Sequence, residues 1–591
     1  MLALDASPWG ELRGILRTYA NERREVLAVV VYKWIEPEPL PEVAYQLVED
    51  VRLSEILFRR GVRTPEEADA FMSPALHQLA DPALLPDAQS ALALLRRAVE
   101  EGWRVVVFGD YDVDGIAATT MLTHTLRSLG LVVQPMIPHR ITDGYGLHLA
   151  DVPAIRAFEP RLVVTVDCGT KSRAALAALR EAGIETLVID HHTVEGCDPL
   201  PEVAFVSPRR PGARYPFSDL AAVGVAYQVL RMLLSGERAS RYLPLVALGT
   251  VADVMPLVGE NRVLVAEGLR RLAQDAPVGL RVLIEEAGLR LHQVRSWHLG
   301  FVLGPRINAA GRLDDPMLAL QLLLTGDERE ARRLARRLSD LNEQRQREVE
   351  RLVEQAEQRL RQESSLPRVL VLADETWNVG LVGLAASRLA SRYARPVVVL
   401  SRQKDVSRGS VRGVTGFDVS RALAACRDLL LEHGGHGAAA GLTVKNERIV
   451  ELQARLLAFA TSTLADETLV PTLQLDAELS PSELTLETVE LLSTLEPFGH
   501  GNPVPRFFVR DVAVDCARLS RNGRHLLFRV VPDGQPPVGA VWFDGAEHLQ
   551  LVQRLKRLDV AFVMRVDTWD GVSRVKLEVL DCRPARAPTL R

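Results

Sequence analysis

Three carboxylates occupy alternate positions in the stretch Gly-Asp-Tyr-Asp-Val-Asp-Gly at residues 109–115, directly after the apolar run 105–108. The side chains are those of Asp110, Asp112 and Asp114. Like charges held this close together are unfavourable unless a cation neutralises them. The spacing therefore predicts a divalent metal site at the end of a buried strand, and such a site needs further ligands from other strand ends.

Two other apolar runs also end in side chains that bind metals. Asp167, in Val-Asp-Cys-Gly, follows the run 162–166, and an Asp-His-His triplet at 190–192 follows the run 186–189. Ligands of an open α/β sheet bind at the carboxyl ends of its strands. Each motif alone is also typical of an ordinary turn, but three at successive strand ends predict one shared site. Carboxylate and imidazole ligands without thiolate suit Mn²⁺ or Mg²⁺, and a pair of such ions serves phosphoryl hydrolysis.

A fourth acid, Asp253, lies in Gly-Thr-Val-Ala-Asp-Val-Met-Pro at residues 249–256. It is either a further metal ligand or a helix cap before an apolar turn. The sequence leaves both interpretations open.

The elements that must position these ligands are short and rich in β-branched residues. The runs 105–108, 162–166 and 186–189 alternate with helical segments, and the helix expected at 172–182 is ended by Gly183. This βαβ rhythm predicts a parallel sheet buried on both faces. Such a sheet would bring the three carboxyl ends to one edge.

Residues 325–363 show a long helical period, and Thr325 with Glu328 forms a capping box at its start. The helix would span roughly 55 Å. Arginine and glutamate fill much of its polar face. It is either a solvated connecting helix or one whose arginines contact nucleic acid.

A second α/β region follows, and the tail after residue 468 changes character. The region has predicted strands at 369–372 and 396–400, a helix at 381–392 and a glycine cluster at 434–441. The tail has short alternating segments separated by Gly, Asp and Asn, which is the pattern of a small β-barrel or sandwich. Its predicted strands are 526–531, 538–542, 561–566 and 575–580.

The composition excludes several classes of protein. A length of 591 residues requires several domains, and 47% hydrophobic with 25% charged residues is ordinary for a globular protein. The net charge of −5 means that any nucleic-acid site must be locally basic. Five scattered cysteines argue against a disulfide framework or a thiolate zinc site and suit a reducing cytoplasm. No transmembrane helix and no secretory signal are expected.

The motifs GDYDVDG, VDCG, DHH and GTVADVMPL together resemble the four motifs of the DHH phosphoesterase superfamily. The resemblance continues through GPRINAAGRL (304–313), GGHGAAAG (434–441) and LEPFGHGNPVPRF (495–507). The full series, over roughly residues 50–585, resembles the RecJ family of bacterial 5′→3′ exonucleases specific for single-stranded DNA. One departure is Asn378 after Trp377, where many relatives have a histidine.

The resemblance implies an α/β protein of several domains. These are a parallel-sheet DHH catalytic domain, a long connecting helix, a second α/β DHH-associated domain and a C-terminal OB-like β-barrel. The expected bounds are 1–50 for an N-terminal extension, 51–324, 325–365, 366–467 and 468–591 for these parts in turn.

The resemblance also implies two divalent ions, Mn²⁺ or Mg²⁺, in a two-metal mechanism. One ion would be held by Asp110, Asp112 and Asp167, and the other by Asp114, Asp167, His191 and Asp253. His192 would face the scissile phosphate and Asp190 would orient the histidines. His192, Asp190 and Asp112 form the expected catalytic set.

Substrate contacts are implied at two places. A pocket for a 5′-terminal phosphate would use Ser410, Arg412, Gly435 and His436; the alternative for this glycine-rich run is a tight turn before a helix. Near the metals, Arg140, Asn308 and Arg312 would contact the DNA backbone. Arg306 is either a further contact or a structural ion-pair partner.

The barrel resembles an OB-fold, which binds single strands by a basic groove and stacking aromatics. Its segment 518–525 holds three arginines, a histidine and the turn Asn522-Gly523, and Phe528 follows. This stretch is either a DNA-contacting hairpin or a solvated basic turn.

The function implied is hydrolysis of single-stranded DNA from its 5′ end to 5′-mononucleotides, in DNA recombination and repair. The resemblance implies a cytoplasmic protein with a single-strand-binding protein and a helicase as partners, and no membrane. One alternative is a DHH phosphodiesterase acting on short oligonucleotides or dinucleotides, against which the barrel argues. Another is an inactive scaffold, against which the complete set of Asp and His ligands argues.

Overall fold

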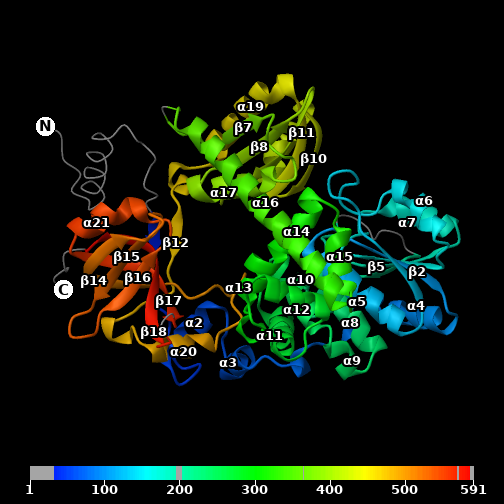
Figure 1. Cartoon of the computed structure of the whole chain (residues 1–591), viewed down its shortest axis with the longest axis horizontal. Coiled ribbons are helices and arrows are strands. Elements are labelled where there is room, and N and C mark those ends of the chain that lie inside the picture. Colours follow the sequence, from blue (N-terminus) through cyan, green and yellow to red (C-terminus); the bar gives the residue numbers. More distant parts are fainter. Residues whose placement is uncertain (1–31, 195–201, 364, 569–570, 586–591) are drawn as a thin grey trace. The chain divides into compact units, whose positions relative to one another are not determined.

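The structure is a computed structural model that describes residues 32–194, 202–363, 365–568 and 571–585. Residues 1–31, most of the expected N-terminal extension, lie outside the described part. The chain divides into two compact units. The larger unit contains residues 37–345 and 475–591, and the smaller contains the residues up to 36 and residues 346–474. Figure 1 labels the elements of both units.

A five-stranded parallel sheet in the order β3-β2-β4-β5-β6 lies in the larger unit. The sequence predicts its three central strands, β2 (Arg104–Gly109), β4 (Leu162–Val166) and β5 (Glu185–Ile189). It misses β3 (Val132–Met136) and β6 (Ala204–Val206). Both are edge strands: β3 carries a glutamine and a proline, and β6 has 3 residues, so neither forms a long apolar run.

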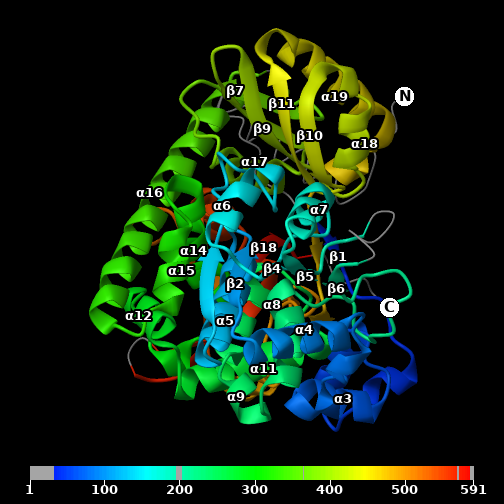
Figure 2. The same cartoon turned by 90° about the vertical axis from the view of Figure 1, so that its right-hand side faces the viewer.

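Both faces of this sheet are covered by helices. Val105 and Val107 of β2 belong to one core with α4, α5 and α8, whereas Val106 and Phe108 belong to another with α6 and α7. Figure 2 shows the strands between α4 and α7. This two-sided burial explains the continuous apolar runs. The helices are α4 (Ala88–Glu100), α5 (Val113–Ser128), α6 (Val152–Ala157), α7 (Arg173–Glu181) and α8 (Ala222–Leu233).

A helical layer follows the sheet along the chain. Its apolar helix α10 is buried along almost its whole length and packs in the same core as α5. Among the described residues, no helix combines the length and the apolar composition needed to cross a membrane. The elements are α9 (Gly236–Ser240), α10 (Leu243–Ala252), α11 (Gly259–Gln274), α12 (Val278–Glu286), α13 (Ser296–His298), the π-helical turn η6 (Leu299–Leu303), α14 (Gly304–Leu313), α15 (Met317–Leu324) and α16 (Glu328–Leu360).

The C-terminal segment forms a closed five-stranded barrel, because β14 pairs with both β15 and β17 around the order β14-β15-β16-β18-β17. The sequence predicts four of these strands and misses β14, whose 13 residues include a bulge where it turns around the barrel. The elements are β13 (Ala477–Glu478), α20 (Leu486–Ser493), β14 (Phe507–Leu519), β15 (Leu526–Val531), β16 (Val538–Trp542), α21 (Leu549–Arg554), β17 (Arg557–Asp567) and β18 (Arg574–Pro584).

Helices α2 (Val51–Arg59) and α3 (Pro65–Met72) share the core of the barrel. Ile56, Leu57 and Phe71 pack with barrel residues such as Phe562. Thr64 caps α3 by accepting from the Glu67 amide, and Pro65 opens the helix. The domain bounds expected from the sequence stay a prediction, and this packing joins part of the expected catalytic domain to the barrel.

A buried arginine fixes the segment that leads into the barrel. Arg262 of α11 is 2% exposed, and its guanidinium donates to the carbonyls of Leu495, Glu496 and Pro497 as well as to that of Phe71. The Leu257 amide donates to the His500 carbonyl at 2.7 Å beside it. The stretch 495–502 therefore docks the barrel directly against the helical layer. One of its contacts, Leu257, lies a few residues after Asp253 in the chain.

The smaller unit contains a mixed five-stranded sheet in the order β10-β11-β9-β8-β7. Only β7 and β8 pair in parallel, and the glycine cluster 434–441 lies in the antiparallel hairpin of β10 and β11. The alternative of a tight turn before a helix is therefore wrong. The elements are β1 (Lys33–Ile35), β7 (Leu370–Asp374), α17 (Val382–Tyr393), β8 (Val397–Arg402), β9 (Val406–Arg412), α18 (Val419–Ala424), β10 (Leu430–His436), β11 (Ala439–Lys445), α19 (Ile449–Thr463) and β12 (Thr472–Gln474).

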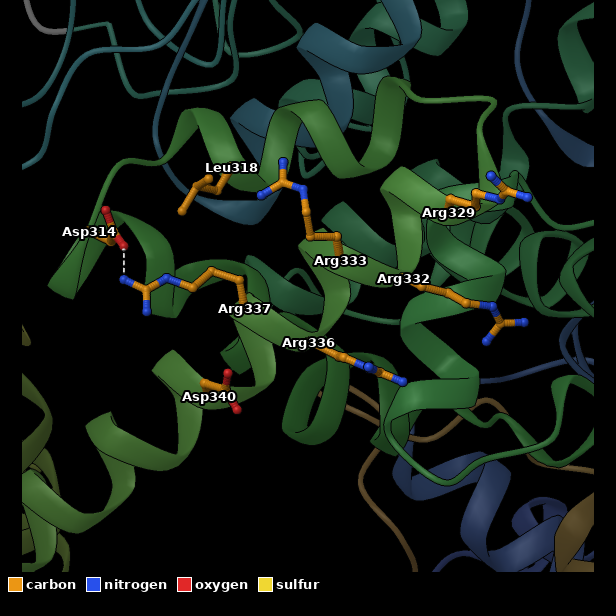
Figure 3. A pocket seen from close by; sticks show the side chains of 8 residues that line it. All are labelled: Asp314, Leu318, Arg329, Arg332, Arg333, Arg336, Arg337 and Asp340. Atoms are coloured by element: carbon orange, nitrogen blue, oxygen red, sulfur yellow. Dashed lines mark hydrogen bonds and ion pairs between the residues drawn. The ribbon is translucent and has the colours of Figure 1, made fainter.

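Helix α16 is the predicted long helix, although its start differs from the expected capping box. Asp327 accepts from the Arg329 amide at 2.8 Å, and Glu328 instead forms ion pairs with arginines. Arginines along its first turns line a surface hollow of about 720 Å³ (Figure 3). Arg332, Arg333 and Arg337 are paired with carboxylates there. These pairs favour the interpretation of a solvated helix face.

Candidate metal centre

The loop after β2 is folded tightly onto the start of α5. Asp112 is the N-cap of α5, and its Oδ1 accepts from the amides of Asp114 at 2.9 Å and Gly115 at 3.1 Å. A Cβ atom at Gly115 would lie 2.5 Å from the Asp110 carbonyl oxygen, so only glycine allows this turn. Asp110 is buried, at 3% exposed. The motif thus places Asp112 at the N-cap of α5 and Asp114 in its first turn.

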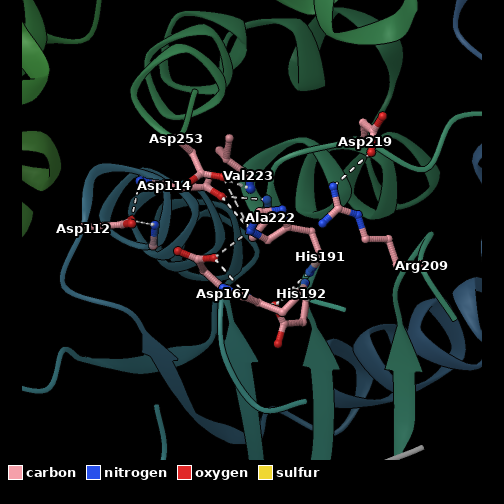
Figure 4. Close-up of polar contacts among 12 residues, drawn as sticks. Asp112, Asp114, Asp167, His191, His192, Arg209, Asp219, Ala222, Val223 and Asp253 are labelled. Atoms are coloured by element: carbon pink, nitrogen blue, oxygen red, sulfur yellow. Dashed lines mark hydrogen bonds and ion pairs between the residues drawn. The ribbon is translucent and has the colours of Figure 1, made fainter. Parts of the chain in front are cut away.

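Asp114 points into the protein from the first turn of α5. Its two oxygens accept from the amides of Ala222 at 2.7 Å and Val223 at 2.9 Å, at the start of α8. A helix N-terminus stabilises a nearby anion. The carboxylate is therefore oriented by a second helix (Figure 4).

Asp167 follows β4 in a left-handed backbone conformation with φ of 61°. Gly169, two residues later, has φ of 112°, and a Cβ there would lie 2.5 Å from the Thr165 hydroxyl. Few residues other than glycine tolerate such a conformation. The motif Val-Asp-Cys-Gly is thus a local turn that directs Asp167 away from the strand and into the site.

Asp190 organises the segment after β5. Its Oδ1 accepts from the His191 amide at 2.8 Å and from His192 Nδ1 at 2.8 Å, and its Oδ2 accepts from the Thr170 hydroxyl at 2.6 Å. These contacts hold the pKa of the buried Asp190 well below its usual range, against the opposing effect of burial. Both carboxylate oxygens of Asp190 are thus occupied by donors from the protein.

The four segments converge on one place. His191 Nε2 lies 3.3 Å from Asp167 Oδ1, 3.6 Å from Asp253 Oδ2 and 4.0 Å from Asp114 Oδ2. Asp253 occupies the C-cap position of α10, so it is at a helix end and also faces the site. The site contains three sets of possible ligand residues, and within each set the ligand atoms lie within 4.8 Å of one another. They are Asp110, Asp112 and Asp167; Asp114, His191 and Asp253; and Asp167, His191 and His192.

Without cations this cluster is electrostatically unfavourable. Burial, followed by the charges of neighbouring aspartates, raises the pKa of Asp114 to about 7 and that of Asp253 to about 9. The same causes raise the pKa of Asp110 and Asp167 well above the usual range. Burial lowers the pKa of His191 to about 4, which favours its neutral, metal-binding form.

The donor atoms fit a pair of divalent ions. Asp110 Oδ1 and Asp253 Oδ2 are buried and have no hydrogen-bond partner within the described part of the chain. Such atoms are costly to bury unless an ion or water satisfies them. Oxygen and imidazole donors without sulfur match the preferences of Mn²⁺ and Mg²⁺. The site therefore has the charge, the donors and the unpaired lone pairs that two cations would use.

Expected backbone-binding residues lie on two sides of the loop 110–112. The Arg140 guanidinium stacks over the Tyr111 ring at 4.8 Å from its centroid. Helix α14 lies against the same loop, because a Cβ at Gly311 would be 3.4 Å from the Tyr111 carbonyl oxygen. Arg312 follows on that helix and its charge acts on Tyr111, while Asn308 is half-buried one turn earlier.

Arg306 is held by the protein itself. Its NH1 donates to the Val302 carbonyl at 2.7 Å, and its Nε donates to the Ser339 hydroxyl at 3.3 Å. These bonds connect η6, α14 and α16. Of the two interpretations left open by the sequence, the contacts favour a structural role, although with a hydroxyl and a carbonyl rather than an ion pair.

Two residues at the site are missed by the sequence analysis. The Tyr145 hydroxyl donates to the Asp167 carbonyl at 3.1 Å and lies 3.1 Å from His192 Nδ1. Arg209, three residues after β6, pairs with Asp219 (Figure 4). Its charge opposes the rise in the pKa of Asp253 and adds to the lowering of the pKa of His191 by burial. The stretch containing Arg140 also contains Tyr145, so its aromatic residue was a usable signal. Nothing in the sequence around Arg209 marks it.

In the smaller unit, the residues expected to bind a terminal phosphate lie on β9 and on β10, two strands separated in the sheet by β11. Arg412 NH1 donates to the Ser410 hydroxyl at 2.6 Å, and its Nε donates to the Ser387 hydroxyl of α17 at 3.0 Å. Gly435 has φ of 153° in β10. His436 ends β10, and its side chain lies outside the described part of the structure. Hydroxyls and a guanidinium are thus grouped beside the start of α17.

The barrel hairpin is formed as the sequence predicts at Asn522-Gly523, where Gly523 has φ of 71° between β14 and β15. Phe528 is 3% exposed in the barrel core, so it cannot stack on a base. The exposed aromatic residue beside the hairpin is Phe543, in edge contact with His525.

Family models match three parts of the chain. They are the DHH family N-terminal domain at residues 104–250, the DHHA1 domain at 366–466 and the RecJ OB domain at 475–581. Single-stranded-DNA-specific exonuclease RecJ from Bacillus subtilis is 32% identical over 557 residues, covering 93% of this chain and 70% of the relative. The Escherichia coli RecJ is 34% identical over 84% of this chain and 91% of its own length. The chain belongs to the RecJ family.

Solved structures agree with the assignment. RecJ from Thermus thermophilus in complex with Mn²⁺ superimposes with a TM-score of 0.80 and 32% identity, over 94% of this chain and 80% of that one. The same enzyme in complex with Mg²⁺ gives a TM-score of 0.73 at 30% identity. The RecJ fold, with two α/β parts and an OB barrel, is therefore the fold of this chain.

Proposed function

We propose that this chain is a metal-dependent exonuclease that hydrolyses single-stranded DNA from the 5′ end and releases 5′-mononucleotides, in DNA recombination and repair. The observation that carries the proposal is the convergence of Asp110, Asp114, Asp167, His191 and Asp253 in one buried cluster. That cluster stands in a chain that also has an OB barrel. A phosphodiesterase for dinucleotides has no need of such a barrel.

The residue roles follow the ligand sets. We assign Asp110 and Asp112 to one ion, Asp114, His191 and Asp253 to the other, and Asp167 to both. When bound, the two ions neutralise the phosphate and lower the pKa of a water molecule. Asp112 keeps its capping bond to α5 through one oxygen, which leaves the other for an ion.

His192 is the cation that this chain itself offers to the scissile phosphate. Burial opposes its protonation, but the hydrogen bond to Asp190 and the surrounding carboxylates outweigh burial and raise its pKa. Nδ1 is committed to Asp190 at 2.8 Å, so Nε2, which has only the Tyr145 hydroxyl at 3.3 Å among the described residues, is the nitrogen assigned to a phosphate oxygen. Tyr145 contacts the same imidazole, with its hydroxyl 3.1 Å from Nδ1 and 3.3 Å from Nε2.

The 5′-terminal phosphate is assigned to the smaller unit. Ser410, Arg412 and Ser387 offer two hydroxyls and a guanidinium, and α17 begins beside them because a Cβ at Gly383 would lie 3.1 Å from Arg412 NH2. A helix N-terminus with a guanidinium is suited to a terminal phosphate. Gly435 and His436 are retained as candidate contacts on β10.

The remaining assignments are drawn from the family. Arg140, Asn308 and Arg312 are assigned to the DNA backbone near the metals. The cytoplasm, a single-strand-binding protein and a helicase are the proposed location and partners. The bounds 1–50, 51–324, 325–365, 366–467 and 468–591 are retained as the proposed domains.

The test uses end-labelled single-stranded and blunt duplex DNA with Mn²⁺, each with and without a 5′-phosphate. We expect stepwise loss of mononucleotides from the 5′ end of single strands only, with the 5′-phosphorylated strand preferred. Arg412→Ala should remove that preference and spare hydrolysis of a dinucleotide. Arg408→Ala, on the same strand β9, is the matched control.

Degradation from the 3′ end, or equal attack on blunt duplex, would contradict the proposal. Activity confined to dinucleotides would establish the alternative of a short-substrate phosphodiesterase. Activity without any divalent ion would exclude the two-metal assignment.

A further inference from the structure

Two large aromatic side chains are exposed together on the helical layer of the larger unit. Trp297 of α13 is 56% exposed, and Phe301 of η6 is 70% exposed. Their ring centroids are 5.7 Å apart and their planes differ by 21°, so the rings are stacked. We call this pair the aromatic platform. Exposed apolar surface of this kind commonly marks a binding site.

Local helix geometry alone does not account for the platform. Side chains four residues apart on a helix contact each other, but such a pair stabilises an exposed helix by only about 0.2–0.5 kcal/mol. Phe301 lies in a π-helical turn, which departs from the regular α-helical hydrogen-bond pattern. Such turns often occur at functional sites. Both rings keep more than half of their surface in solvent, so packing does not explain them.

The platform is connected to the metal centre on one side. A Cβ at Gly300 would lie 3.3 Å from Val251 Cγ1, so the π-helical turn rests directly on α10, whose C-cap is Asp253. The next helix, α14, carries Asn308 and Arg312 and touches the metal-binding loop at Tyr111. Figure 1 shows α10, α13 and α14 in the same region of the larger unit.

The platform is connected to the barrel on the other side. The Ser296 hydroxyl, one residue before Trp297, donates to the Phe498 carbonyl at 2.6 Å in the segment that leads into the barrel. Arg295 pairs with Glu496 of that segment at 3.2 Å and remains half exposed. The platform therefore lies between the metal centre and the barrel, within a single compact unit.

We infer that Trp297 and Phe301 form a stacking platform for bases of the single strand between the metal centre and the barrel. This inference rests on the proposed function. Flat aromatic rings accept any base on their faces, which suits a nuclease that must bind without regard to sequence. Arg295, two residues before Trp297 and half exposed, supplies a contact for the backbone while the rings hold the bases.

The test measures equilibrium binding of the full chain, in EDTA to prevent hydrolysis, to a 5′-phosphorylated oligothymidylate of about 20 nucleotides. Trp297→Ala and Phe301→Ala should each weaken binding about tenfold, which is the loss of one stacked base. Trp297→Phe and Phe301→Tyr keep a flat ring and should bind as the unchanged protein does. Val132→Ala, a comparably exposed apolar residue at the far end of β3, is the matched control.

A series of oligonucleotides with one abasic site each decides whether the rings contact bases. One or two abasic positions should weaken binding to the unchanged protein, and they should cause no further loss in Phe301→Ala. Hydrolysis of a dinucleotide with Mn²⁺ should remain unchanged in both alanine variants, because so short a substrate does not reach the platform.

Unchanged affinity in both alanine variants would overturn the inference. The inference would also fail if the loss of affinity caused by an abasic site added fully to the loss of affinity caused by the alanine substitution. Parallel loss of dinucleotide hydrolysis and melting temperature would show that the rings support the fold instead, which also overturns it. If the unchanged protein hydrolyses DNA but shows no abasic effect, only the platform fails. If it does not bind single strands at all, the proposed function fails with it.

Discussion

At the scale of single residues, several groups at the metal centre combine a structural and a chemical task. Asp112 caps α5 through one oxygen, and in the proposed site its other oxygen would bind an ion. Asp253 occupies a helix C-cap and faces His191. Asp190 accepts from the three backbone amides of Thr170, His191 and His192 and also contacts His192 Nδ1. Local hydrogen bonds therefore fix the ligands before any metal arrives, so little side-chain entropy remains to be lost on binding.

Replacing Asp112 by asparagine separates its two tasks. Asparagine caps a helix about as well as aspartate, so the fold should be retained. The loss of one anionic ligand should lower kcat by at least about 100-fold and weaken Mn²⁺ binding by a similar factor. Steady-state kinetics and metal titration by calorimetry measure both quantities.

The control is Asp50→Asn, which changes the N-cap of α2, where Asp50 accepts from the Leu53 amide. That variant should keep full activity. Equal activity of Asp112→Asn and the unchanged protein would exclude Asp112 from the metal set.

At the scale of elements, the barrel is attached to the helical layer by a short, heavily hydrogen-bonded segment. Arg262 donates to three successive carbonyls of that segment, and Asn502 is 1% exposed and donates to two of them. Burial lowers the pKa of Arg262 to about 10, which leaves it charged at neutral pH. The motif Leu-Glu-Pro-Phe-Gly-His-Gly-Asn is thus a docking element for the barrel.

Replacing Arg262 by methionine should loosen this docking segment. The carbonyls of residues 495–497 would lose their donor in a buried place, at a cost of about 3 kcal/mol. Hydrogen exchange at residues 495–502, including the Leu257 amide bonded to His500, should accelerate about 100-fold. Mass spectrometry of the exchanged full chain measures it.

Arg270→Met is the matched control, since Arg270 lies on the same helix with a side chain 58% exposed. It should leave exchange in this segment unchanged. Equal protection in Arg262→Met and the control would show that the arginine does not hold the barrel.

At the scale of the whole molecule, the metal centre is a concentration of negative charge that the fold must compensate. Four aspartates have raised pKa values because of burial and mutual repulsion. Cations that bind only the folded state stabilise it according to their concentration over the dissociation constant. The larger unit, which holds all of these aspartates, should therefore be the part that responds to metal.

Removing divalent ions with EDTA should lower the melting temperature by several degrees, and excess Mn²⁺ should restore it. At a free concentration about 100 times the dissociation constant, the gain is about 2.7 kcal/mol. Scanning calorimetry of the full chain resolves the transitions of its parts. Asp167→Asn should show a smaller metal-dependent shift, whereas Asp418→Asn, a cap in the smaller unit, should show the full shift. Equal shifts in the two variants would exclude Asp167 from metal binding.

The sequence by itself determined the central strands of the parallel sheet and the chemistry at their ends. Continuous runs of β-branched residues have few alternatives to buried parallel strands. The acids and histidines directly follow these strands in the chain, so the strands that position them are visible in the sequence. It also determined four of the barrel strands, because the alternation of apolar and polar residues between two turns is a local signal. The edge strands β3 and β6 and the long bent β14 lacked such a signal.

Only the tertiary structure decided which distant groups meet. Tyr145 reaches His192 across the site, Arg262 reaches the barrel segment, and Phe528 turns into the barrel core instead of toward solvent. The glycine cluster became a hairpin because β11 already pairs with β9 on one side and offers its other edge to β10. These outcomes depend on long-range packing, which neighbouring residues in the chain do not encode.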